Sequence, residues 1–161
     1  MSQSRPVPTV GTFAGNYFLG RPSYVRYLKA FSKAIYPFIN DPDNPFTFTR
    51  PDGLMIRPLA TMETDMGTVP RSVRVLISKD RYLDSYIIHD SGYMQGGFSV
   101  SRDCGKTWGV IRVSRKIVDQ QLRDCIRAQG ANRATRNAVY FAVRSAGGGI
   151  WKRRHGAVSG T

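Results

Sequence analysis

One segment combines residue types that could do chemistry. Residues 87–93, with the sequence IIHDSGY, hold one of the two histidines of the chain. An imidazole titrates near neutral pH, so it can take a proton from water and return it to a leaving group. If residues 83–94 form a helix, His89, Asp90 and Tyr93 share one neighbourhood, because side chains three and four residues apart lie on the same face. A hydrogen-bonded histidine of the core is the commoner reason for such a pattern, so a catalytic role requires further partners.

A carboxylate on a second helix supplies one such partner. Apolar residues at helical spacing predict a helix between Ser114 and Gly130, and Asp119 lies on or beside its buried face. A buried carboxylate must be paired or hydrogen-bonded, since leaving it bare costs several kcal/mol. We therefore expect Asp119 to contact His89.

Other elements must hold these two helices in place. Residues 22–38 carry apolar side chains at steps of three and four, which predicts an amphipathic helix that packs on its own domain or a sister subunit, or docks on a membrane. Residues 46–56 alternate and turn like a β-hairpin, and residues 133–145 form a further predicted helix. The expected fold class is α+β but mainly α, with three to four helices around the histidine and aspartate cluster and small β-hairpins.

Residues 101–108 match the Asp-box pattern S-x-D-x-G-x-T-W. This box resembles those of sialidases and other propellers, in which Asp and Gly shape a hairpin turn and Trp packs beneath it. The sequence holds one copy, whereas a propeller needs repeated blades of about 40 residues. We therefore interpret residues 98–113 as a hairpin insertion and Asp103 as a turn residue.

The sequence predicts one globular domain between two basic segments. Residues 1–21 lack helical periodicity and are expected to form an extended arm, residues 22–151 the domain, and residues 152–161 a basic tail. The tail follows an aromatic anchor, Trp151, and is either a solvated terminus or a binding segment. Cys104 and Cys125 lack a metal-binding spacing, so we expect free thiols, while a bridge between them stays open.

The charge of the chain indicates a polyanionic neighbour. Lysine and arginine number 24 against 11 aspartates and glutamates, which gives a net charge of +13. Nucleic acid, an anionic membrane or an acidic protein assembly would each match this charge. The N-terminus lacks a signal peptide and no apolar run approaches the roughly 20 residues of a membrane span, so we expect synthesis in the cytoplasm without a membrane anchor.

Several motifs resemble, in order and spacing, an uncharacterised domain family that is common in tailed bacteriophages and prophages. They are Thr64-Asp65-x-x-Thr68-Val69-Pro70, then His89-Asp90-x-x-Tyr93, then the segment from Ser114 to Leu122 with Asp119. The resemblance covers roughly residues 54–151. It implies a virion protein that contacts other virion subunits or DNA, as an oligomer or as part of a larger assembly.

The segment His89-Asp90-Ser91-Gly92-Tyr93 is also similar to the HD-x-G-Y segment of prokaryotic phospholipases A(2). This resemblance implies that His89 is the general base for a water that attacks a lipid ester. Asp119 would then orient the imidazole and accept a hydrogen bond from Tyr93. The same resemblance implies calcium held by Asp90 and by the loop that contains Asp65 and Gly67, since carboxylate and carbonyl oxygens are hard ligands.

Two functions are therefore expected. The first is a virion-associated structural role, in which the cluster is a buried network that specifies the core. The alternative is a phospholipase-like ester hydrolase that acts on lipid of the bacterial envelope. Hydrolysis requires Asp119 within hydrogen-bond reach of one ring nitrogen of His89, with the other nitrogen facing an open cleft near Asp90.

Overall fold

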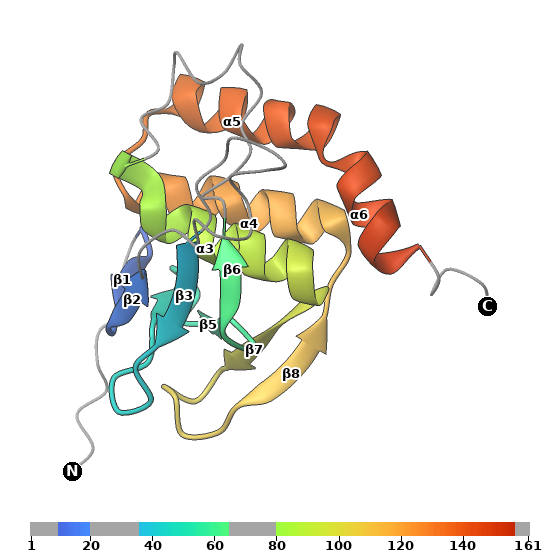
Figure 1. Ribbon diagram of the computed structural model, residues 1–161. Coiled ribbons are helices and arrows are strands. Elements are labelled where there is room, and N and C mark those ends of the chain that lie inside the picture. Colours follow the sequence, from blue (N-terminus) through green and yellow to red (C-terminus); the bar gives the residue numbers. More distant parts are fainter. Residues whose placement is uncertain (1–9, 20–35, 65–79, 157–161) are drawn as a thin grey trace.

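The computed structural model describes residues 10–19, 36–64 and 80–156, and Figure 1 shows the arrangement of their helices and strands. The strands are β1 (Thr12–Ala14), β2 (Tyr17–Leu19), β3 (Tyr36–Asn40), β4 (Thr47–Thr49), β5 (Met55–Arg57), β6 (Met62–Thr64), β7 (Gly97–Ser101) and β8 (Gly109–Arg112). The helices are the 3-10 turn η1 (Asp80–Tyr82) and the α-helices α3 (Leu83–Gln95), α4 (Arg115–Ala128), α5 (Arg133–Ala146) and α6 (Gly148–His155).

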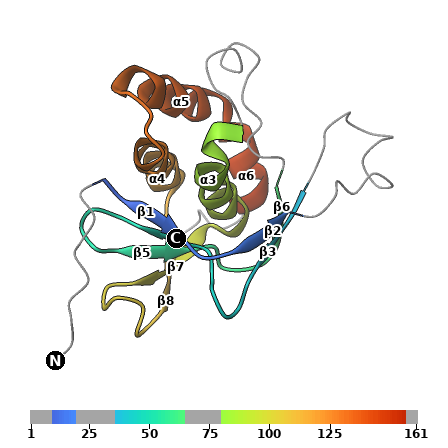
Figure 2. The same ribbon diagram turned by 90° about the vertical axis from the view of Figure 1, so that its left-hand side faces the viewer.

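The strands form two antiparallel sheets. One sheet has five strands in the order β1-β4-β5-β7-β8, and the other has three in the order β2-β3-β6. Helices α3 and α4 lie side by side over the sheets, and α5 lies on the far side of α4 (Figures 1 and 2). The prediction of a mainly α fold is wrong, because the described residues form eight strands in two sheets beside the helices; the fold is α+β.

The larger sheet supplies apolar side chains to the core from its inner strands. Phe48, Ile56 and Phe98 come from three neighbouring strands of the larger sheet, and each is at most 2% exposed. They pack against Ile87 and Ile88 of α3, which are fully buried. Helix α3 is buried on most sides because it packs both on the sheets and on α4.

The Asp-box hairpin consists of β7 and β8, and β7 is an inner strand that pairs with β5. Asp103 receives hydrogen bonds from the Thr107 amide at 2.9 Å and the Ser101 hydroxyl at 2.7 Å. Cys104 and Gly105 take positive φ angles of 59° and 84° to make the tip. The predicted role of Asp103 as a turn residue is confirmed, and Cys104 and Cys125 are free thiols.

The N-terminal segment contributes to both sheets. Strands β1 and β2, which lie within the expected arm of residues 1–21, pair with β4 and β3. The amphipathic helix predicted for residues 22–38 falls mostly outside the described residues, and its predicted end is wrong because Tyr36–Asn40 is a strand. Periodicity misled there because Phe38 is fully buried as a strand residue and equally suits either pattern.

The helices predicted around the cluster are confirmed as α3, α4 and α5. Helices α3 and α4 run antiparallel: the start of α3 meets the end of α4, where Ser85 bonds to Gln129. At the other end of the pair, Gly92 of α3 lies against Val118 of α4. Among the described residues, every helix is too short or too polar to cross a bilayer.

The segment expected to begin the basic tail is helical. Helix α6 packs across the end of α3, with Trp151 edge-on to Tyr93 at a ring distance of 5.4 Å. The Nε2 atom of His155 donates to the Tyr93 carbonyl at 2.8 Å, which caps a carbonyl that the end of α3 leaves free. Gly96 makes room for this contact, because a Cβ at Gly96 would lie 3.0 Å from the His155 ring.

Candidate active site

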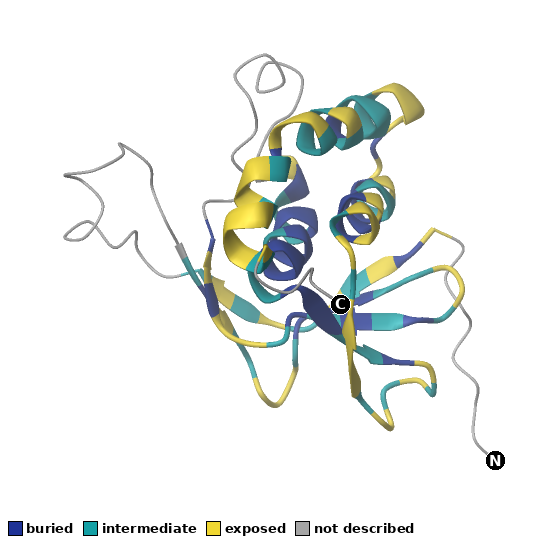
Figure 3. Cartoon of the chain, turned by 90° about the vertical axis from the view of Figure 1, so that its right-hand side faces the viewer, coloured by how far each residue is buried: buried dark blue, intermediate teal, exposed yellow. Residues whose placement is uncertain are grey.

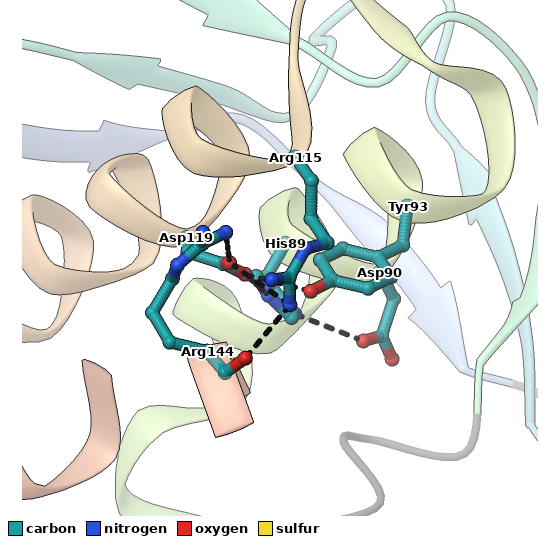
Figure 4. A network of polar contacts seen from close by, with 6 residues as sticks. All are labelled: His89, Asp90, Tyr93, Arg115, Asp119 and Arg144. Atoms are coloured by element: carbon teal, nitrogen blue, oxygen red, sulfur yellow. Dashed lines mark hydrogen bonds and ion pairs between the residues drawn. The ribbon is translucent and has the colours of Figure 1, made fainter. Parts of the chain in front are cut away.

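Three helices bring six polar side chains together beside the core (Figure 4). Helix α3 supplies His89, Asp90 and Tyr93, helix α4 supplies Arg115 and Asp119, and helix α5 supplies Arg144. Gly92 permits this convergence, since a Cβ there would lie 2.7 Å from Val118 and 2.6 Å from Phe98. The two helices can therefore approach closely enough for Asp119 to reach the α3 side chains.

Asp119 is fully buried and accepts hydrogen bonds from both predicted partners. The Nε2 atom of His89 lies 3.1 Å from Oδ1 of Asp119, and the Tyr93 hydroxyl donates to the same oxygen at 2.9 Å. Because a carboxylate can only accept, the Nε2 atom carries a proton in this arrangement. The predicted grouping of His89, Tyr93 and Asp119 is therefore present in the structure.

Two arginines approach the other oxygen of Asp119. The Nη1 atom of Arg144 donates to Oδ2 at 2.8 Å, and Nη1 of Arg115 lies 3.8 Å from the same oxygen. Arg115 also donates to the backbone carbonyl of Arg144 at 2.9 Å. A buried ion requires compensation of its charge, and these arginines supply it to a carboxylate that has no access to water.

The other ring nitrogen of His89, Nδ1, is buried and makes no hydrogen bond within the described residues. It lies 3.5 Å from Oδ1 of Asp90, which is a charge contact and too long for a well-formed hydrogen bond. The second oxygen of Asp90 accepts from the Thr64 hydroxyl at the end of β6. The structural requirement for hydrolysis is thus met on the Nε2 side, whereas Nδ1 faces Asp90 without contact to solvent.

Charges in the cluster shift its pKa values in opposite directions. Burial lowers the pKa of His89, but the hydrogen bond to Asp119 and the negative charges of Asp119 and Asp90 outweigh burial, so this pKa lies above its ordinary value of 6.5. Burial raises the pKa of Asp119, yet His89 and Arg144 hold it below 3.8. Burial and the nearby Asp119 raise the pKa of Tyr93, so its hydroxyl remains a donor. Both shifts of the His89 and Asp119 pair favour imidazolium beside carboxylate.

The predicted calcium ligands are described only in part. Asp65 and Gly67, and with them the expected calcium loop, lie outside the described residues. Asp90 alone is present, with a side chain that is 14% exposed, and the described residues hold no group of three histidine, cysteine or acidic side chains arranged for a metal. One carboxylate with a hydroxyl neighbour supplies oxygen ligands of the type calcium prefers, but too few for its usual six to eight.

Sequence reasoning missed three participants. The spacing of Arg115 and Asp119, four residues apart on one helix, was an available signal for a pair. Only the packing of α5 on α4 brings Arg144 to Asp119, so no local pattern in the sequence indicated this contact. Thr64 belongs to the motif that precedes the helix of His89, but nothing in that motif indicated that its hydroxyl would contact Asp90.

Residues 43–143 match the family described as "Protein of unknown function (DUF1353)". This match includes the whole of α3 and α4, and hence His89, Asp90, Tyr93, Arg115 and Asp119. No curated protein and no solved structure matches the chain. With well over half of its 161 residues matched, the chain belongs to the DUF1353 family.

Proposed function

We propose that this protein is a phospholipase-like ester hydrolase that acts on lipid of the bacterial envelope, with His89 as general base. The observation that supports the proposal is the asymmetry of the imidazole. Its Nε2 atom is fixed by Asp119, which Tyr93 and Arg144 hold in turn, whereas Nδ1 makes no hydrogen bond within the described residues. An imidazole that is oriented through one nitrogen and unpartnered at the other suits proton transfer, and the reaction requires the cluster to open so that water reaches Nδ1, which is buried in this structure.

Each proton has a place in this reaction. Nδ1 takes a proton from a water molecule as the water oxygen attacks the ester carbonyl carbon. The imidazolium that forms is stabilised by Asp119 through Nε2, as the short distance of 3.1 Å allows. When the bond from carbon to the leaving oxygen breaks, Nδ1 returns the proton to that oxygen, so the products are a carboxylic acid and an alcohol.

Asp90 lies where it could serve this chemistry in one of two ways. Its Oδ1 atom is 3.5 Å from Nδ1 and can stabilise the imidazolium by charge. Alternatively, Asp90 would hold a calcium ion together with Asp65 and Gly67, and such an ion would stabilise negative charge on the ester oxygen. The two roles differ in one measurement, because only the second makes hydrolysis sensitive to a calcium chelator.

Hydrolysis of dispersed phosphatidylglycerol by the purified protein tests the proposal. The wild type should release fatty acid, whereas His89→Asn should lose about two to four orders of magnitude in kcat, the usual contribution of a general base. Tyr93→Phe is the matched control. It removes one hydrogen bond to Asp119 and leaves the imidazole in place, so it should lose far less activity than His89→Asn. Equal release by wild type and His89→Asn, or none by either, would remove the hydrolase proposal. Such a result would mean that Nδ1 stays closed to water.

A second candidate function is a structural role in a phage virion, with contacts to other virion proteins or DNA. The observation that favours it is burial: the His89 side chain is only 8% exposed and Asp119 is not exposed at all. A buried network of this kind can specify a core without doing chemistry. In that case, phage particles produced with a folded His89→Asn variant should assemble normally. Antibody detection of the protein in purified particles tests whether it is located in the virion. Absence from particles would count against the virion role.

A further inference from the structure

Three segments meet at the last turn of α3. The Arg112 side chain at the end of β8 donates to the Gln95 carbonyl at 2.6 Å, and the Val113 amide donates to the Gly96 carbonyl at 3.1 Å. His155 of α6 bonds to the Tyr93 carbonyl. The first turn of α4 meets the last turn of α5 through Arg115 and Arg144. The end of β8, the start of α4 and the whole of α6 therefore lie at one end of the molecule.

This end carries unneutralised positive charge. Its exposed cations are Arg112, Lys116, Lys152, Arg153 and Arg154. None of the five forms an ion pair with a carboxylate of the described residues. The sequence explains why, since residues 104–118 and 125–161 contain no aspartate or glutamate. The local charge is thus far more one-sided than that of the chain as a whole.

Exposed isoleucines lie within two residues of these cations along the chain. Ile111 is 40% exposed, Ile117 is 45% exposed and Ile150 is 36% exposed. They come from β8, α4 and α6, so each of the three segments contributes an aliphatic side chain as well as a cation. Figure 3 looks onto the side that carries α6, where α6 and β8 are both coloured as largely exposed. We call these eight residues the α6–β8 surface: Ile111, Arg112, Lys116, Ile117, Ile150, Lys152, Arg153 and Arg154.

We propose that the α6–β8 surface is the face by which this protein docks on an anionic phospholipid bilayer. The inference rests on the proposed lipid ester hydrolysis for the choice of a bilayer as partner. Two features of the surface match a bilayer together: cations for the phosphate headgroups and aliphatic side chains for the boundary with the acyl chains. A nucleic acid would match the cations but would leave the three isoleucines in water.

The surface is directly connected to the candidate active site. Trp151 lies between exposed neighbours on α6 and packs on Tyr93, whose hydroxyl bonds to Asp119. Trp151 and His155 hold α6 against Tyr93, and the exposed cations occupy the remainder of the helix circumference. Docking through these cations would bring the end of α3, which bears the cluster, close to the lipid.

Co-sedimentation with vesicles tests this proposal. The wild type should bind vesicles of phosphatidylglycerol and phosphatidylcholine and bind weakly to pure phosphatidylcholine. Each basic residue near an anionic surface contributes about fivefold to binding, so the triple variant Lys152→Glu, Arg153→Glu, Arg154→Glu should lose at least about 100-fold. The matched control, Arg81→Glu, Arg102→Glu, Lys106→Glu, makes the same change in net charge at exposed positions elsewhere and should lose much less. Equal losses in the two triple variants would overturn the assignment of this face.

Two further measurements separate this inference from the hydrolase proposal and from nucleic-acid binding. His89→Asn should bind vesicles as the wild type does even where hydrolysis is lost, and the α6 triple variant should still hydrolyse a short-chain ester in free solution. The double variant Ile117→Ser, Ile150→Ser should weaken vesicle binding several-fold and leave binding to duplex DNA unchanged. If this double variant binds vesicles like the wild type, or if DNA is preferred to the vesicles, bilayer docking is refuted.

Discussion

Asp119 shares its two carboxylate oxygens among side chains from three helices. His89 and Tyr93 bond to one oxygen, and Arg144 bonds to the other. Because the carboxylate has no contact with water, each lost partner leaves charge or lone pairs uncompensated in the interior. The stability of the site should therefore depend on this residue more than on any of its partners.

Replacement of Asp119 by asparagine tests this dependence. Asp119→Asn should lower the free energy of unfolding by about 3 kcal/mol, at the low end for a broken buried ion pair because the Arg144 side chain is 30% exposed and can turn to water. Urea denaturation measures the change. Tyr93→Phe, which removes one neutral donor, should cost only about 1 kcal/mol. Equal costs would mean that Asp119 acts as a simple hydrogen-bond acceptor.

Stability should depend on pH through the same pair. The pKa of His89 is raised in the folded state, so its stabilising contribution is full below pH 6.5 and is lost as the pH rises through the folded pKa. The pKa of Asp119 is depressed, so its contribution is present above pH 3.8 and is lost as the pH falls through the folded pKa. Urea midpoints measured from about pH 5 to about pH 9 should fall with pH for the wild type and fall less for His89→Gln. Parallel curves would contradict the raised pKa.

Hydrolysis should follow the opposite trend. A general base must be neutral before it accepts a proton, so kcat should rise with pH through a pKa above 6.5. Initial rates on a water-soluble ester across the same pH range provide the measurement. Activity that falls on the alkaline side while the protein stays folded would exclude neutral His89 as the base.

At the scale of single residues, the sequence predicted the contacts of Asp119 with His89 and Tyr93 but not its contact with Arg144. Helical spacing was enough to place His89 and Tyr93 together and to put Asp119 on a buried face, because both patterns are local. Arg144 lies 25 residues from Asp119, and its contact depends on how α5 packs on α4. A side chain with a long flexible stem can point to solvent or inward, and no local pattern distinguishes the two.

At the scale of elements, the close approach of α3, α4 and β7 depends on Gly92. Gly92→Ala should destabilise the protein by about 1–3 kcal/mol, although alanine favours helices, because its methyl group would overlap Phe98 and Val118. Gly149→Ala in α6 is the matched control. Its Cβ would meet only the tip of Arg153 at 3.8 Å, so the change should be neutral or slightly stabilising. Thermal unfolding of the two variants decides, and similar melting temperatures would show that the helices can separate at no cost.

The Asp-box turn should be separable from the candidate active site. Asp103 bonds to the amide and hydroxyl of Thr107 and to Ser101, and these bonds depress the pKa of its carboxyl group. Asp103→Ala should therefore speed hydrogen exchange at the Thr107 amide while hydrolysis stays unchanged. Loss of hydrolysis in this variant would show that the hairpin shapes the site after all.

The helices were easier to predict than the sheets for a physical reason. Helices α3, α4 and α5 are 13 or 14 residues long, which is enough for several repeats of the apolar pattern. Most strands have three residues, too few for alternation to be recognised, and β1 pairs with a strand more than 30 residues away. Short strands in non-local pairs give no clear pattern in the sequence, so the sequence predicts a mainly α fold.

At the scale of the whole molecule, the N-terminal strands close both sheets at their edges. Strand β1 borders the five-stranded sheet and β2 borders the three-stranded sheet, and the Tyr17 hydroxyl donates to Asp84 at the start of α3. Removal of residues 1–19 should therefore lower stability and expose the aromatic side chains that pack under these strands. Dye binding and urea denaturation measure both effects. The point variant Tyr17→Phe, which removes only the hydroxyl, should cost much less, and equal costs would mean that the strands themselves add nothing.

A single residue joins the helix of His89 to the sheet: α3 ends at Gln95, β7 begins at Gly97, and Gly96 makes the turn between them with a φ of 63°. Extra residues inserted at this junction would rotate the imidazole away from its carboxylate. A peptide tag inserted at the exposed tip near Cys104 would instead lie on the surface of the hairpin. Anyone who wishes to tether this protein to a fluorophore or a second domain should therefore open the chain at the tip and leave the helix junction intact.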